Sequence, residues 1–128
     1  MLSIMTEYKP GVCNIGSAEI AKRKHAGWIG AGVTAILGLV IFWLRVPAVW
    51  RLSLFVPAFF AATGSLQGFM HFCAGFGMKG VFNFDQVGQT EKIEQEEYRT
   101  RDRRKAQQIL ACSALIGIVV ALASFFFP

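Results

Sequence analysis

The sequence predicts an all-α integral membrane protein: a helical hairpin followed by a third transmembrane helix with a cytoplasmic helical extension. Apolar residues make up 54 % of the 128 positions, and charged residues make up only 16 %, below the roughly 25 % usual in soluble domains. The apolar residues are grouped in long blocks instead of alternating with polar ones. Three blocks approach or exceed the roughly 20 residues that a helix needs to cross a hydrocarbon core of about 30 Å.

Residues 1–25 are predicted to form a cytoplasmic arm that ends in the amphipathic start of a helix. Ser17 is a suitable N-cap, and Glu19 lies in the first turn, where the helix dipole favours a negative charge. The helix is expected to continue directly into a first span at residues 26–44. A tryptophan lies near each end of this span, as in the aromatic belts of membrane proteins.

The second span, residues 48–72, follows a short turn that contains a proline. Pro57 lies inside this span and is expected to kink it. Residues 73–105 form a predicted cytoplasmic segment, which is a glycine-rich loop up to residue 89 and then a charged helix capped by Thr90. This helix is expected to run without a break into the third span, residues 106–127.

The distribution of basic residues predicts the orientation. In a three-span protein the N-terminal segment and the second loop share one side, and together they carry 11 Lys and Arg residues against two in the first loop. The positive-inside rule therefore predicts a cytoplasmic N-terminus and an external C-terminus. The net charge of +5 suits anionic lipid at the cytoplasmic face. Nucleic acid is not an expected partner, because no basic run is interleaved with exposed aromatic residues.

Small residues predict close packing between helices. Gly30, Thr34 and Gly38 recur every four residues in the first span, and Gly64 and Gly68 form a GxxxG pair in the second. Such faces let two helix backbones approach closely in a membrane. We expect a homo-oligomer, or a subunit of a membrane complex, that assembles through these faces.

The histidines and cysteines offer one candidate constellation. His25, His71 and Cys73 fall near the same predicted membrane face, and imidazole with thiolate is a soft-metal ligand set. No HxxxH or CxxC spacing supports a metal, however, and interfacial histidines with a small apolar cysteine are the simpler interpretation. The sequence therefore predicts no metal and no cofactor. No hydrolase, kinase or transferase motif is present, so no catalytic residue is predicted.

The charged helix is the predicted contact surface for a protein partner or for anionic lipid, although a solvated helix face is the simplest explanation of its charges. Its basic residues are Arg99, Arg101, Arg103, Arg104 and Lys105. We therefore expect a small non-enzymatic scaffold or accessory subunit. An alternative is a passive channel or carrier, formed by an oligomer around Thr34, Thr63 and Gln67 with Cys73 at its cytoplasmic mouth. The absence of a charged residue at mid-membrane disfavours an ion-coupled pump.

Several short motifs resemble a known family. They are Asn14-Ile15-Gly16, Glu19 and Arg23 before the first span, Trp50, Pro57-Ala58 and Thr63-Gly64 around the second, and Phe72-Cys73, Phe76-Gly77 and Gly80 at its end. Together, over residues 13–80, they resemble the YgaP-like inner-membrane domain, a two-helix hairpin of bacterial membrane proteins. The resemblance implies a bacterial plasma-membrane hairpin that dimerises through its helices.

In some members of that family the hairpin is fused to a rhodanese domain that handles sulfane sulfur, so sulfur species are candidate solutes for the conduit alternative. These 128 residues contain no such domain. Ala74 stands where a proline often follows the cysteine of the family, and the chain adds a charged helix and a third span. The resemblance implies a fold more than a function, since most of the family has no established activity.

Overall fold

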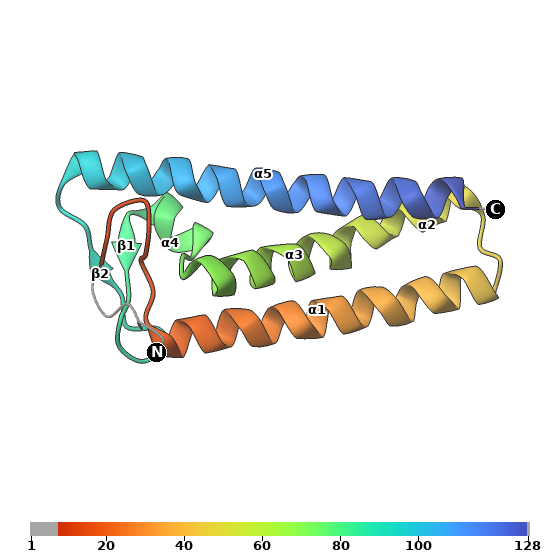
Figure 1. The fold of residues 1–128 in the computed structure, drawn as a ribbon, viewed down its shortest axis with the longest axis horizontal. Helices are drawn as coiled ribbons and strands as arrows, with labels where there is room; N and C mark the ends of the chain where they lie inside the picture. Colours follow the sequence, from red (N-terminus) through yellow and green to blue (C-terminus); the bar gives the residue numbers. More distant parts are fainter. Residues whose placement is uncertain (1–7, 128) are drawn as a thin grey trace.

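The computed structural model describes residues 8–127. Three long rods run side by side along the molecule (Figure 1). The first rod is α1 (Ser17–Trp43), and the last is α5 (Glu96–Phe126). The second rod is assembled from α2 (Ala48–Arg51), a 3-10 turn at Leu52–Leu54 and α3 (Phe55–Met70). All three are long and apolar enough to cross a membrane.

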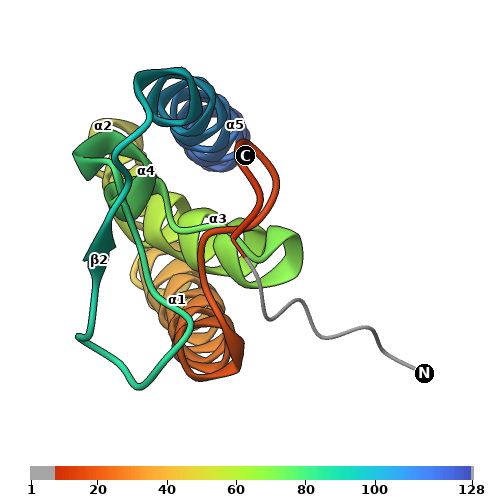
Figure 2. The same cartoon turned by 90° about the vertical axis from the view of Figure 1, so that its left-hand side faces the viewer.

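α3 forms the middle layer of the bundle. It lies between α1 and α5 in two perpendicular views (Figure 1 and Figure 2) and packs against both helices. α1 therefore packs on one side only, and just 11 % of its most apolar stretch is buried. Large side chains such as Ile36 and Leu39 point outward from it. The outer surface of the bundle is consequently apolar along most of its length.

The segments that connect α3 to α5 gather at one end of the bundle, where Figure 1 shows them beside the N-terminal arm. They contain α4 (Ala74–Lys79) and two short strands, β1 (Val81–Phe82) and β2 (Glu91–Lys92). The strands pair antiparallel, with Val81 opposite Lys92, and Ile15 of the arm bridges to Asn83. We call residues 8–16 and 71–95, at this end, the cap.

The first and the last long helix are each continuous, as the sequence predicts. α1 runs from the arm into the first span, and α5 joins the charged helix to the third span. The prediction of a loop over residues 73–89 is wrong in part, because this segment holds α4 and β1. Burial explains the difference, since Phe72 and Ala74 pack against Ala106 and Ile109 of α5. α5 begins after Gln95 rather than at Thr90, because the strand β2 intervenes.

The second rod is interrupted upstream of Pro57. A proline lacks the N–H that would bond the carbonyl of Ser53, and its ring crowds that carbonyl. A 3-10 turn forms at Leu52–Leu54. Its hydrogen bonds join residues three apart, so they do not need the N–H that Pro57 lacks. The span is thus interrupted at this turn, upstream of Pro57, and the kink itself stays a prediction.

Arg51 ties together the end of the bundle opposite the cap. Its Nε donates to the carbonyl of Val46 at 3.1 Å, and its Nη1 donates to that of Phe127 at 2.8 Å. The guanidinium also lies over the ring of Phe42, 5.0 Å from the centroid. One cation thus satisfies carbonyls at the end of α5 and in the turn after α1, which a helix terminus otherwise leaves unpaired.

Candidate functional site

Asn14 fastens the N-terminal arm to the chain just after α3. Its Oδ1 accepts the N–H of Cys73 at 2.7 Å, and its Nδ2 donates to the Cys73 carbonyl at 3.1 Å. The backbone carbonyl of Asn14 accepts the N–H of Asn83 at 3.0 Å. Asn14 is fully buried, so these bonds satisfy groups that cannot reach water. The arm, the end of α3 and the strand region are thereby held in one unit.

Glu19, in the first turn of α1, is a buried carboxylate that bonds to the cap. Its Oε1 accepts from Arg23 Nη1 at 2.6 Å, and its Oε2 accepts from Asn83 Nδ2 at 2.9 Å and from the N–H of Gly88 at 3.2 Å. Burial alone raises the pKa of Glu19, but the hydrogen bonds from Gly88 and Asn83 and the charge of Arg23 together hold it below its ordinary value. The carboxylate is therefore ionised and fully bonded at neutral pH.

The guanidinium of Arg23 also covers the thiol of Cys73. Its Nη2 lies 3.0 Å from Cys73 Sγ, and the group lies over the ring of Phe76, 5.5 Å from the centroid. Cys73 is only 5 % exposed. The sulfur is therefore a member of a closed polar network, in which Arg23 bridges the thiol to Glu19.

Asp102 of α5 anchors the arm at a second point. It is fully buried, and it accepts the hydroxyl of Tyr8 at 2.8 Å and the N–H of Gly11 at 2.7 Å. Burial raises the pKa of Asp102, and the bonds from Gly11 and Tyr8 oppose that rise without cancelling it. The ring of Tyr8 stacks on Phe82 at 4.9 Å, which also holds the arm against β1.

The candidate metal residues do not converge. His25 is exposed on α1, and His71 ends α3 in the left-handed conformation, with φ 57°. Within residues 8–127, no three His, Cys, Asp or Glu side chains lie where they could hold a metal ion. His25, His71 and Cys73 therefore do not form a ligand set. Cys13 is buried in the arm, where burial raises the pKa of its thiol.

The small residues of the first two rods contact each other within the chain. A Cβ added at Gly30 would lie 2.8 Å from the Ala61 Cα, and one at Gly64 would lie 2.7 Å from the nitrogen of Gly27. A Cβ at Gly68 would meet the stem of Lys24 at 2.5 Å. The GxxxG pair therefore packs α3 onto α1. Assembly of several chains through these glycines stays a prediction, and it would have to use surface that this packing leaves free.

The remaining two predicted packing residues lie further along α1. Thr34 donates its hydroxyl to the Gly30 carbonyl at 2.8 Å. Gly38 is more open, since a Cβ there would find only Leu54, at 3.9 Å. The close α1–α3 contact is thus concentrated in the half of the bundle nearer the cap.

The predicted basic contact surface divides into two parts. Arg99 donates to the carbonyls of Ile93 and Glu94 at 2.6 and 2.9 Å and so fixes the end of the cap. Arg101 pairs with Glu97 at 3.0 Å on the exposed face. Arg103 and Arg104 are exposed, and Lys105 is half-buried. Within residues 8–127, none of these last three forms an ion pair.

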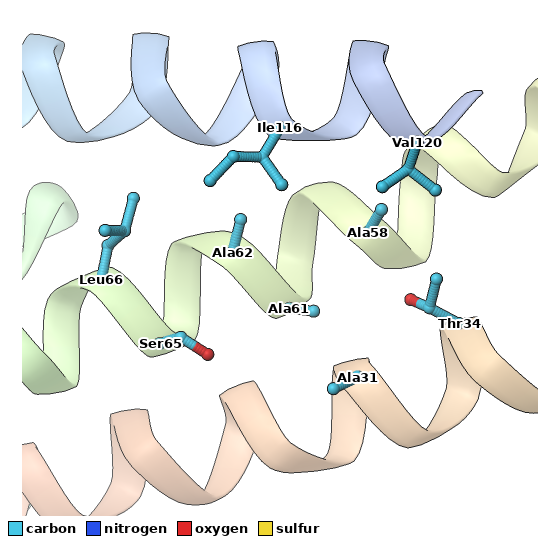
Figure 3. Close-up of a pocket in the computed structure, with 9 residues that line it drawn as sticks. All are labelled: Ala31, Thr34, Ala58, Ala61, Ala62, Ser65, Leu66, Ile116 and Val120. Carbon is cyan, nitrogen blue, oxygen red and sulfur yellow. The ribbon is translucent and has the colours of Figure 1, made fainter. Parts of the chain in front are cut away.

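The three rods leave an apolar groove of about 360 Å³ near the middle of the bundle. Figure 3 shows α3 as its floor, with side chains of α1 on one side and of α5 on the other. It is lined by Ala31, Thr34, Ala58, Ala61, Ala62, Ser65, Leu66, Ile116 and Val120. Most of these side chains are small, which is why the helices leave room between them.

Sequence reasoning missed several residues that organise the cap. The sequence patterns assign no role to Asn83, Asp102 or Tyr8, yet all three make long-range hydrogen bonds. Asp102 did carry a signal, because it is the only acid in the basic run RTRDRRK. A small stripe at Ser113 and Gly117 was also missed, and it lies buried against the middle rod, where a Cβ at Gly117 would meet Phe55 at 2.8 Å.

Comparison of the chain with protein-family models, with curated proteins and with solved structures finds no match. The resemblance of residues 13–80 to the YgaP-like domain therefore stays a prediction.

Proposed function

We propose that the protein is a non-enzymatic, three-span scaffold or accessory subunit of the bacterial plasma membrane, and that its cap lies in the cytoplasm. One observation carries this proposal: along the rods many large apolar side chains are exposed, whereas small residues supply much of the contact between the helices. Ile36, Leu39 and Leu115 face outward, whereas Ser113 and Gly117 are buried. In water such an exposed apolar surface would be a liability, whereas in a bilayer it is the required surface.

The positions of the charges support the orientation. Lys22 and Lys24 on α1, Lys79 on α4, and Arg103 and Arg104 on α5 are all exposed near the cap end of the bundle. Among the described residues, the basic side chains at the opposite end are those of Arg45 and Arg51. By the positive-inside rule, this distribution of charge supports a cytoplasmic position of the cap.

The cap supports the scaffold part of the proposal. Two buried carboxylates hold it to the bundle: Glu19 of α1 accepts hydrogen bonds from Asn83 and Gly88, and Asp102 of α5 accepts them from Tyr8 and Gly11. The cap therefore presents a surface of fixed shape. In the described part of the chain, Arg103 and Arg104 have no carboxylate oxygen within 4.0 Å. Unpaired cations on a rigid support suit an acidic partner surface or anionic headgroups, and screening by salt should weaken either contact.

The proposal is tested by purifying the tagged full-length chain in a mild detergent and reading its complexes by native mass spectrometry. We expect a stoichiometric partner or a homo-oligomer whose abundance falls about tenfold in the double variant Arg103→Gln, Arg104→Gln. Arg101→Gln is the matched control, because that side chain is already paired with Glu97. A monomer in every preparation, or equal losses in the variant and the control, would contradict the scaffold proposal.

The conduit alternative gains no specific support from the single chain. Thr34 and Thr63 donate to backbone carbonyls one turn earlier in their own helices, and Gln67 accepts the N–H of Ala74. The groove lined by Thr34 is not lined by Thr63 or Gln67. A path built by several copies remains a prediction.

A further inference from the structure

The apolar groove continues along the α1–α3 seam toward the cap. A second hollow, of about 320 Å³, is lined by Lys24, Trp28, Ser65 and Phe69, and Ser65 lines both hollows. Helical spacing supports this continuity. On α1, Lys24, Trp28 and Ala31 share one stripe, and on α3, Ser65 and Phe69 share another, since residues three and four apart lie on one face. The two hollows are thus parts of one groove.

The chemistry of this groove changes along its length. Around Ala31 and Ala62 it is walled almost entirely by apolar atoms (Figure 3). At the cap end it meets the Lys24 side chain and Trp28, which is 79 % exposed. The stem of Lys24 crosses the α3 backbone at Gly68, where an added Cβ would clash with it at 2.5 Å. Its position along the seam is thereby restricted.

Lys24 has no acidic partner in residues 8–127: neither of the two ion pairs found there includes it. Ten residues separate it from Thr34, at the other end of the groove, which in a helix corresponds to about 15 Å. That is half of the roughly 30 Å hydrocarbon core, or one leaflet. The groove therefore has the length of one leaflet, an apolar body and a single cationic end at headgroup depth.

We propose that this groove binds one anionic phospholipid of the cytoplasmic leaflet, with an acyl chain along the seam and its phosphate at Lys24. The proposal rests on the proposed membrane function and names a lipid class for one defined place on it. Charge complementarity decides the occupant. A phospholipid matches both the apolar body and the cationic end, whereas an apolar helix of a second copy would leave Lys24 without a counter-charge. Trp28 at the mouth suits the interfacial position that tryptophan prefers.

The test uses the full-length chain in micelles supplied with equal amounts of phosphatidylglycerol and phosphatidylcholine, with retained lipid counted by native mass spectrometry. We expect one retained phosphatidylglycerol in preference to phosphatidylcholine. Lys24→Gln keeps the stem and removes the charge, so retention of the anionic lipid should fall about fivefold. Lys22→Gln is the matched control, since two residues turn the helix by about 200° and place that charge on the opposite side.

A second pair of variants tests the apolar part. Ala31→Phe fills the groove from an exposed position on α1, and we expect it to abolish retention of both lipids. Val33→Phe places the same ring on the opposite face of α1 and should leave retention unchanged. Thermal unfolding of each variant checks that the bundle still folds.

Three results would overturn the proposal: equal lipid retention by Lys24→Gln and Lys22→Gln, no effect of Ala31→Phe, or a lipid-free dimer that Ala31→Phe dissociates. The last result would show that a second copy of the chain occupies the groove. A chain that remains in the membrane fraction and retains no lipid removes only this inference. A chain that carbonate washing releases from membranes removes the proposed function as well.

Discussion

At the scale of single residues, hydrogen bonds between buried polar groups determine the shape of the cap. Asn14 imitates a neighbouring strand, since its carboxamide offers Cys73 one acceptor and one donor. Glu19 offers two oxygens and receives three donors, from Arg23, Asn83 and Gly88. A buried polar group is costly only when it is unpaired, so this network specifies one arrangement of the arm.

Replacing Asn14 by alanine should open this network. Asn14→Ala leaves the N–H and the carbonyl of Cys73 without their partners, at about 1–3 kcal/mol for each buried unpaired group. We expect a loss of at least about 2 kcal/mol in the free energy of unfolding and faster alkylation of Cys73. Alkylation is measured in a Cys13→Ser, Cys112→Ser background. The exposed Gln89→Ala is the control, and equal alkylation rates in the two variants would argue against the anchor.

Tyr8 makes docking of the arm sensitive to alkaline pH. Burial, then the hydrogen bond to Asp102, then the charge of that carboxylate raise the pKa of Tyr8 well above its ordinary value of 10.0. The folded chain thus holds the phenolic proton more tightly than the unfolded chain. Its stabilising contribution is complete below pH 10 and falls as the pH rises above that value.

Hydrogen exchange of the Gly11 amide, which donates to Asp102, reports this docking. After correction for the intrinsic pH dependence of exchange, we expect its protection to decline above pH 10 in the wild type. In Tyr8→Phe the protection should be lower at neutral pH, because the bond to Asp102 is lost, and the decline above pH 10 should disappear. A decline of the same size in both proteins would show that Tyr8 is not the titrating group.

At the scale of elements, the first two rods pack through glycines, whereas the second and third pack through a stripe that includes Gly117 and Ser113. Without a hydrophobic driving force between helices in lipid, close backbone approach supplies the attraction. Gly27 and Gly64 therefore stabilise the bundle because they let the two helix backbones approach closely. A glycine on the outer face of α1 makes no such contribution.

Two glycines on α1 separate these roles. A Cβ at Gly27 would lie 2.7 Å from the backbone nitrogen of Ser65, whereas one at Gly32 would meet nothing within 4 Å. Gly27→Ala should lower stability by about 1–3 kcal/mol through overpacking. Gly32→Ala should raise it by about 0.5–1 kcal/mol, because alanine is the better helix former. Thermal unfolding followed by circular dichroism compares the two, and shifts in the same direction would refute the packing argument.

At the scale of the whole molecule, hydropathy is enough to predict the three rods, because each apolar block is a local signal. The unbroken α5 follows from its sequence in the same way, with acids first and bases next. The cap could not be derived so directly. Its bonds join residues far apart in the chain, such as Asn14 with Cys73 and Tyr8 with Asp102, 94 positions away, and no periodic pattern marks such pairs.

The candidate site shows the same division between local and long-range information. Glycines spaced by four marked a packing face, yet the sequence could not say that Gly64 would meet Gly27 of its own chain rather than a neighbour. The sequence places the Cys73 thiol near histidines, but in the structure its Sγ contacts the guanidinium of Arg23, 50 positions earlier. Partner choice depends on how the rods are placed, which composition and spacing do not encode.

The central claim is that three rods cross a membrane and place the cap in the cytoplasm. It is tested most directly by labelling single added cysteines in intact bacterial cells with a membrane-impermeant maleimide, in the Cys112→Ala background. Gln86→Cys lies in the cap and Pro47→Cys in the turn between the first two spans at the opposite end, and both positions are exposed. We expect labelling of Pro47→Cys in intact cells and of Gln86→Cys only after permeabilisation, with the background protein unlabelled. Labelling of Gln86→Cys in intact cells, or equal labelling of both positions before permeabilisation, would contradict it.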